Sequence, residues 1–203
     1  MICEYPDKIF KVDDGTFESS ALEIFRFQYR NNEIYRLYVD TLGIDHKQVQ
    51  HLHQVPFLPI RFFKSHHVVS GIFQPEAVFE SSGTTQTVPS RHFVKDLDLY
   101  IKSFTEGFEQ VYGAVNNWCV IGLLPSYLER NNSSLIVMVH EMIRRSNRSQ
   151  SGFYLYDFDK LAKVLQELEQ RKQPVLLIGV TFALMDFARA HPMQLRETII
   201  MET

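Results

Sequence analysis

Two short and almost wholly apolar runs, residues 118–124 and 175–180, constrain the fold more than any other feature of the sequence. Runs of this length and composition are typical of strands in a parallel sheet, because such strands are covered on both faces. Between the two runs, residues 161–168 carry leucine and valine at helical spacing. Strands that alternate with helices predict an α/β fold with a largely parallel sheet flanked by helices.

Further elements extend this pattern toward both ends of the chain. A helical pattern over residues 17–39 is broken at Asn31-Asn32, and another over residues 97–111 stops at Gly113. We expect a helix over residues 182–190, with Thr181 as its cap. The pattern changes near residue 76, which divides the sequence into a helical region with an extended connector, residues 1–75, and an α/β region, residues 76–203. Additional strands are expected at residues 77–79, 135–139, 153–156 and 198–201.

Composition excludes several classes of protein. The chain of 203 residues has a formal net charge of −3, which gives no general attraction to nucleic acid or to an anionic membrane. Cys3 and Cys119 form no CxxC pattern, so neither a structural zinc site nor a disulfide framework is indicated. The first residues lack the pattern of a secretory signal, and no apolar run reaches the roughly 18 residues of a membrane span. We therefore expect a cytoplasmic protein without a membrane span.

The segment of residues 80–87 places five hydroxyl residues around a single glycine. Glycine lets backbone N–H groups approach a phosphate closely, and hydroxyl groups can donate to its oxygens. We expect this segment to join a strand to a helix, which is a suitable place for a nucleotide phosphate. Clusters of Ser, Thr and Gly are also common in plain loops, so the composition leaves both interpretations open. The segment has neither the Gly-Lys pair of a Walker A loop nor the three glycines of a dinucleotide fingerprint.

The motif Ser82-Gly83-Thr84-Thr85 resembles the phosphate loop of adenylate-forming enzymes, and other motifs flank it in order. The preceding motif is Pro56-Phe57-Leu58-Pro59-Ile60, and the following ones are Ser90-Arg91-His92, Leu123-Leu124-Pro125-Ser126-Tyr127 and Ile178-Gly179-Val180-Thr181. Together they resemble the acyl-protein synthetase family (LuxE type), the fatty-acid ligases associated with bacterial luciferase, and more distantly phenylacetate–CoA ligases. The resemblance covers residues 50–203.

The resemblance implies the fold of an adenylate-forming ligase, with residues 76–203 as its nucleotide-binding region and this chain as an N-terminal part. It implies that ATP and Mg²⁺ activate a carboxylic acid, in this family a fatty acid, to an acyl adenylate. The acyl group then passes to a thiol acceptor, either a protein cysteine or CoA. The residues that the resemblance assigns to the β- and γ-phosphates are Ser81, Ser82, Gly83, Thr84 and Thr85.

Three further side chains are candidates for an acyl or carboxylate site. Tyr127 matches the family segment near the acyl site, although a core tyrosine beside Pro125 fits equally well. His92 could reach a phosphate or a carboxylate, whereas most loop histidines lie at the surface. His140 precedes Glu141 after an expected strand, where a catalytic pair is well placed. No metal ligand set is recognised, because the residue four positions after His140 is Arg144 and the HExxH spacing is absent.

Two departures from the family pattern keep other functions open. Gln86 stands where the pattern has glycine, and the usual loop lysine is missing, although Arg91 or Lys95 could replace its charge. A non-catalytic binding or scaffold module that retains the fold is therefore one alternative. A phenylacetate-type CoA ligase, which differs in the acid and the acceptor, is another.

Overall fold

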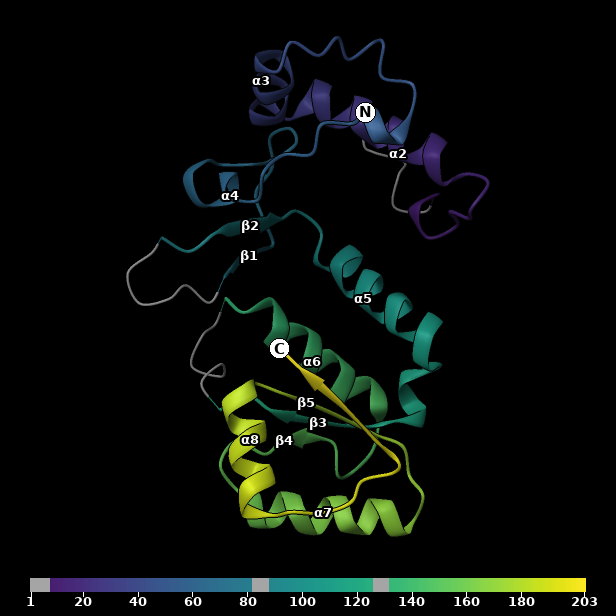
Figure 1. Ribbon diagram of the computed structural model, residues 1–203, viewed down its shortest axis with the longest axis vertical. Helices are drawn as coiled ribbons and strands as arrows, with labels where there is room; N and C mark the ends of the chain where they lie inside the picture. The colour runs from purple at the N-terminus through teal and green to yellow at the C-terminus, as the bar shows by residue number, and fades with distance from the viewer. Residues whose placement is uncertain (1–7, 82–87, 126–131) are drawn as a thin grey trace. The chain divides into compact units, whose positions relative to one another are not determined.

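The computed structural model describes residues 8–81, 88–125 and 132–203. The chain forms two compact units, Met1–Tyr100 and Ile101–Thr203, which are considered separately below (Figure 1). The boundary between these units, after Tyr100, follows from which residues pack together. The boundary expected between residues 75 and 76 separates a helical region from a nucleotide-binding region. That functional division stays a prediction.

Helices make up the first part of the first unit. Asn32 separates two of them, and its side-chain oxygen accepts a hydrogen bond of 3.0 Å from the backbone N–H of Tyr35, which caps the second helix. The break expected at Asn31-Asn32 is confirmed. The two helices pack against each other and against Val49 through a small core. Its buried residues are Leu22, Phe25, Tyr35, Val39 and Val49. The helices are α2 (Phe17–Asn31), α3 (Glu33–Thr41), the short η1 (Leu52–Gln54) and α4 (Phe62–Ser65).

An antiparallel hairpin completes the first unit. Strand β1 (Ala77–Glu80) pairs with β2 (Arg91–Val94), and the register places Glu80 opposite Arg91 and Phe79 opposite His92. The hydroxyl-rich segment therefore joins two strands, and the expectation that it leads from a strand into a helix is wrong. The sequence pattern does not predict strand β2, because its four residues do not alternate cleanly between polar and apolar. It forms because β1 supplies the backbone partner.

The second unit contains a four-stranded sheet in which all neighbouring strands are parallel. The order of the strands is β4-β3-β5-β6, so the chain returns from the β4 edge past β3 to β5. This confirms the α/β class and the parallel sheet. The strands are β3 (Cys119–Leu123), β4 (Gly152–Phe153), β5 (Val175–Gly179) and β6 (Thr198–Glu202). The helices are α5 (Leu97–Tyr112), which begins in the first unit, α6 (Ser134–Ser146), α7 (Phe158–Gln170) and α8 (Thr181–Ala190), and the short η2 is Val115–Asn117.

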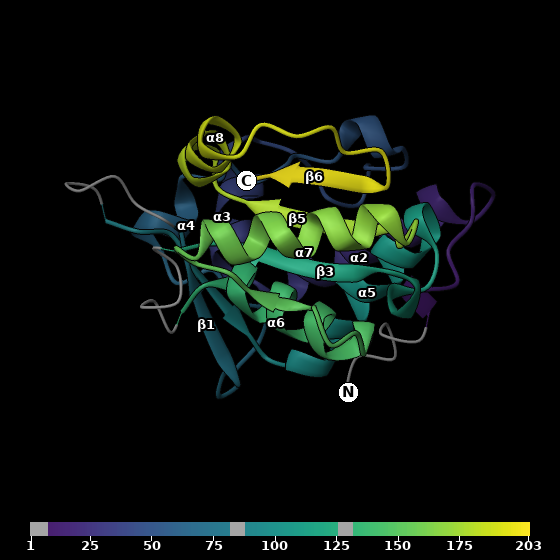
Figure 2. The same ribbon diagram turned by 90° about the horizontal axis from the view of Figure 1, so that it is seen from below.

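Helices cover both faces of this sheet. Figures 1 and 2 show α6 on one face and α7 with α8 on the other. Phe158 of α7 and Phe187 of α8 meet edge to face, with ring centroids 5.7 Å apart. Every residue of β3 and β5 is buried, which explains why both strands appear in the sequence as continuous apolar runs.

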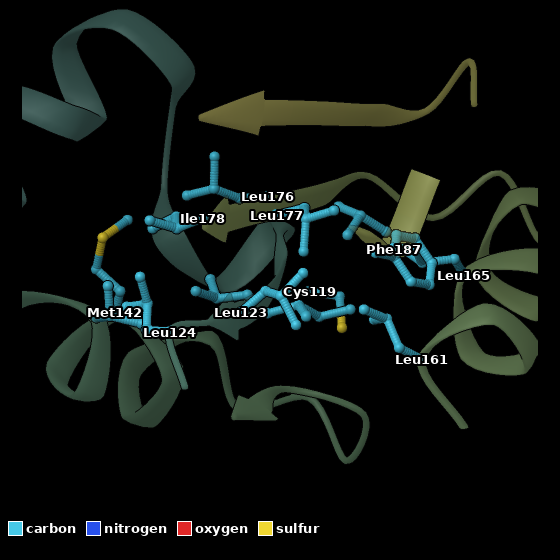
Figure 3. Packing of buried hydrophobic residues seen from close by; sticks show 14 of the residues in the cluster. Cys119, Leu123, Leu124, Met142, Leu161, Leu165, Leu176, Leu177, Ile178 and Phe187 are labelled. Atoms are coloured by element: carbon cyan, nitrogen blue, oxygen red, sulfur yellow. The ribbon is translucent and has the colours of Figure 1, made fainter. Parts of the chain in front are cut away.

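The core of the second unit lies between these layers. Figure 3 shows Leu165 of α7 beside Phe187 of α8, and Met142 of α6 near Leu124 at the end of β3. Cys119 is fully buried, and burial raises the pKa of its thiol. Its environment is that of a small apolar side chain.

Three local expectations are wrong in this unit. Residues 135–139, expected as a strand, lie in α6, where the hydroxyl of Ser133 caps the helix by accepting from the N–H of Ile136 at 3.4 Å. The strand expected at residues 153–156 is instead Gly152–Phe153, which shares only Phe153 with the expected range. Thr181 is the first residue of α8 and not its cap, since Val180 occupies the cap position.

Candidate functional site

Two hydrogen bonds between Ser81 and Ser90 close the loop end of the β1–β2 hairpin. The N–H of Ser81 donates to the carbonyl oxygen of Ser90 at 3.0 Å. The N–H of Ser90 donates to the side-chain oxygen of Ser81, also at 3.0 Å. The Ser81 hydroxyl thus serves as an acceptor here, and a hydroxyl group also carries one proton that it can donate. Ser90 contributes only main-chain atoms to these bonds; the sequence marked it as part of a flanking motif but gave it no role in the site.

Most of the expected phosphate loop lies outside the described residues. This applies to Ser82, Gly83, Thr84 and Thr85, and equally to Gln86. Tyr127, expected near the acyl site, also lies outside them. The roles of these residues stay predictions.

Arg91 follows Ser90 at the start of β2, and its side chain is exposed. Glu80 stands directly opposite it in the register. Within the described ranges, no carboxylate lies within 4.0 Å of the Arg91 guanidinium group, so Glu80 does not neutralise it. A free guanidinium group presents several donors in a planar arrangement that suits a carboxylate or a phosphate.

An open hollow of about 260 Å³ lies beside this end of the hairpin. One wall comes from the segment around α4, where Ile60 and Phe63 contribute apolar surface, and the other comes from the start of β2. His92 lines this hollow together with Arg91, so the structure brings one expected histidine close to Ser81 and Ser90. Neither Ile60 nor Phe63 was predicted as a site residue, because neither carries a polar group that would mark a site.

His140 belongs to the second unit and lies on the exposed side of α6. Its neighbour Glu141 is bound by Arg144 at 2.6 Å and by Arg145 at 2.7 Å. The hydrogen bond from Arg144, with Arg145 adding to it, lowers the pKa of Glu141 to about 2. Glu141 is therefore an ion-paired helix residue, and the expected position of a His140–Glu141 pair after a strand is wrong.

The sheet of the second unit has a second place suited to a ligand. The chain leaves β3 through α6 toward β4 on one side, and leaves β5 through α8 toward β6 on the other. The carboxyl ends of β3 and β5 thus border the point where the strand order reverses, which is where open α/β sheets bind ligands. Thr181 begins α8 at this edge, and its hydroxyl donates a short hydrogen bond to the carboxylate of Glu202.

Among the described residues, no group of three or more His, Cys, Asp or Glu side chains is arranged to hold a metal ion. None of the helices in this part of the chain is both long enough and apolar enough to cross a membrane.

Comparison with protein-family models, with curated proteins and with solved structures finds no match for this chain. The family resemblance therefore rests on the motifs quoted from the sequence, and the activity that it implies is a proposal.

Proposed function

We propose that this protein takes part in the ATP-dependent activation of a carboxylic acid to an acyl adenylate. The observation that carries this proposal lies at the loop end of the hairpin. There Ser81 and Ser90 close the hydroxyl-rich segment, and Arg91, which has no carboxylate partner among the described residues, follows directly. A glycine-containing segment with hydroxyl donors and a nearby guanidinium group has the chemistry to bind the phosphates of a nucleotide.

The reaction needs electrostatic help at phosphorus more than it needs a reactive side chain. A carboxylate oxygen attacks the α-phosphorus of ATP, and a new C(O)–O–P bond forms. The bond to the β-phosphate oxygen breaks, and pyrophosphate leaves with the electron pair. Mg²⁺ supplies positive charge to the phosphates when bound, and the protein contributes positioned donors. We assign that donor role to Ser81, Ser82, Gly83, Thr84 and Thr85.

Arg91 supplies a positive charge near the place where the family pattern has a lysine that this sequence lacks. Its guanidinium group lies one residue beyond Ser90, the residue that closes the loop, and has no carboxylate partner among the described residues. Lys95 comes after the end of β2 and is exposed. The positive charge that the loop itself lacks is therefore present at Arg91, where a phosphate or a carboxylate can pair with it.

A thiol acceptor, either a protein cysteine or CoA, completes the proposed reaction by attacking the acyl carbon and releasing AMP. The acid belongs to the fatty-acid or aryl-acid class. The resemblance assigns Tyr127 to the segment near the acyl group, and we keep that role as part of the proposal.

Titration calorimetry with MgATP tests the nucleotide part of the proposal on the 203-residue chain. We expect saturable binding that Gly83→Val weakens at least tenfold, since a β-branched side chain would block close approach of a phosphate. Unchanged affinity in Gly83→Val would remove the loop from the mechanism. ATP–pyrophosphate exchange by the protein, across a panel of carboxylic acids, tests the chemistry. Exchange with no acid would favour a binding or scaffold module, and a preference for phenylacetate would favour the CoA-ligase type.

A further inference from the structure

The hollow beside the hairpin combines an apolar wall with the guanidinium group of Arg91, which no carboxylate of the described residues neutralises. Ile60 and Phe63 form the apolar part, and Ile60 leaves 83% of its surface exposed, which is a high value for an isoleucine. Exposed apolar surface at a concave site is typical of a place where a ligand with an apolar part binds. Ser90, Arg91 and His92 provide the polar side of the same hollow.

Arg91 is on the side of β2 that faces the segment around α4. Side chains alternate along a strand, so Arg91 shares its side with Phe93, two residues further on. The ring of His67, just after α4, meets the ring of Phe93 edge to face with centroids 4.2 Å apart. The α4 segment therefore packs over the Phe93 side of the strand. The Arg91 side chain starts from that same side, next to the apolar wall.

We propose that this hollow binds the acid substrate itself, with the carboxylate held by Arg91 and the apolar part against Ile60 and Phe63. This inference rests on the proposed function. It specifies the acid as a monocarboxylate whose apolar part is a single ring or a short chain. The volume of about 260 Å³ lies below the range of roughly 300–1,000 Å³ usual for drug-sized ligands, so a long acyl chain would not be enclosed.

The location also brings the two reacting groups into one neighbourhood. Ser90 lines the hollow and at the same time closes the hydroxyl-rich segment through its bonds to Ser81. A carboxylate at Arg91 would lie next to Ser90, which is at one end of the segment to which we assign the phosphates. Activation requires this proximity, because the new bond joins the carboxylate to phosphorus.

Binding of three probes to the 203-residue chain, measured by calorimetry without ATP, tests the inference. We expect phenylacetate and hexanoate to bind, and the neutral phenylacetamide to bind at least tenfold more weakly, because it cannot form the charged pair with Arg91. Arg91→Gln should weaken phenylacetate at least tenfold and leave phenylacetamide unchanged. Lys64→Gln, an exposed cation in the same segment that does not line the hollow, should change neither.

A second variant, Ile60→Glu, tests the same hollow in case Arg91→Gln fails to fold. Ile60 is almost fully exposed, so Ile60→Glu should fold normally while its charge repels a carboxylate from the hollow. Equal phenylacetate affinity in wild type, Arg91→Gln and Ile60→Glu would overturn the inference, as would no binding of either acid. MgATP binding or exchange without these effects would leave the proposed function standing and the hollow rejected. Carboxylate binding that depends on Arg91 without any nucleotide binding would reject the proposed function and retain the hollow as a site for small carboxylates.

Discussion

Ser81 and Ser90 hold the two ends of the hydroxyl-rich segment together through a reciprocal pair of hydrogen bonds, each 3.0 Å long. One bond uses only main-chain atoms, and the other uses the Ser81 hydroxyl as its acceptor. The pair continues the ladder of the hairpin by one step beyond Glu80 and Arg91. The side chain of Ser81 therefore helps to hold together the two ends of the segment that we propose binds phosphate.

The first prediction concerns this side chain. Ser81→Ala removes the acceptor for the Ser90 N–H and a hydroxyl donor for phosphate, so we expect MgATP affinity to fall about tenfold, equivalent to ~1.4 kcal/mol. Ser90→Ala is the matched control because it keeps both bonds, and its MgATP affinity should stay within twofold of the wild type. Titration calorimetry measures both. Equal affinities for the two variants would show that the Ser81 side chain has no part in binding.

The second prediction concerns a glycine in the centre of the sheet. A β-carbon at position 122 would lie 2.6 Å from ring atom Cδ1 of Phe153 and 3.2 Å from a methyl carbon of Val139. Gly122→Ala should therefore destabilise the second unit by about 1–3 kcal/mol, because Phe153 must move within a packed layer. Urea unfolding followed by Trp118 fluorescence reports on this unit, which contains the single tryptophan of the chain.

The matched control for that substitution is Gly107→Ala. Gly107 lies in α5 with open space around its α-carbon, and alanine favours helix by roughly 0.5–1 kcal/mol over glycine. Gly107→Ala should therefore raise the urea midpoint. A loss of stability as large as that of Gly122→Ala would contradict the steric explanation.

The third prediction concerns pH. The pKa of Glu141 is lowered to about 2 from an ordinary value of 4.5, mainly by its hydrogen bond with Arg144. The stabilisation is therefore complete above about pH 4.5 and disappears as the pH falls from 4.5 toward 2. Arg144 is 65% exposed, so solvent screening limits the contribution to about 0.5–1 kcal/mol.

Glu141→Gln should lower the free energy of unfolding by this amount at pH 7 and flatten its dependence on pH between 4.5 and 2. Asp186→Asn is the control, because the Asp186–Arg189 pair is wider, at 3.7 Å, and exposed on both sides. Its effect should stay below about 0.5 kcal/mol. An unchanged acid limb in Glu141→Gln would refute the role given to this carboxylate.

The fourth prediction concerns the end of α7. Lys172 has φ of +54°, a left-handed conformation, and its N–H donates to the carbonyl oxygen of Glu169 at 3.1 Å. Glycine adopts this conformation without steric cost, so Lys172→Gly should stabilise the second unit by roughly 0.5–1 kcal/mol. Lys163→Gly, in the middle of the same helix, should instead destabilise it by about 1 kcal/mol. Thermal unfolding of the two variants decides the matter, and a shift of the same sign in both would count against this account.

Local sequence was enough to predict much of the second unit. Strands β3 and β5 were predicted because burial on both faces leaves no polar position in them. The stop of α5 at Gly113 was also predicted, and the structure gives this glycine φ of +76°. In the first unit, Asn32 was expected within a helix break, since asparagine caps helices well.

Other features depended on partners far away in the sequence. The apolar, β-branched run at residues 135–139 resembles a strand, but Val139, Met142 and Ser146 are buried at helical spacing against the sheet. Strand β2 exists because β1 pairs with it. Both errors arise because a short segment accepts more than one backbone conformation until its neighbours bury one face or satisfy its hydrogen bonds.

The sequence by itself determined the class of the fold and the chemistry available at the loop, since these depend on residue types and on local periodicity. The tertiary structure decided where that chemistry lies. It closed the loop through Ser81 and Ser90, left Arg91 without a carboxylate partner among the described residues, and set Ile60 and Phe63 beside them. Ile60 and Arg91 are separated by 31 positions in the chain. Only the packing of the α4 segment on the hairpin brings them to one hollow, and no local pattern encodes such a contact.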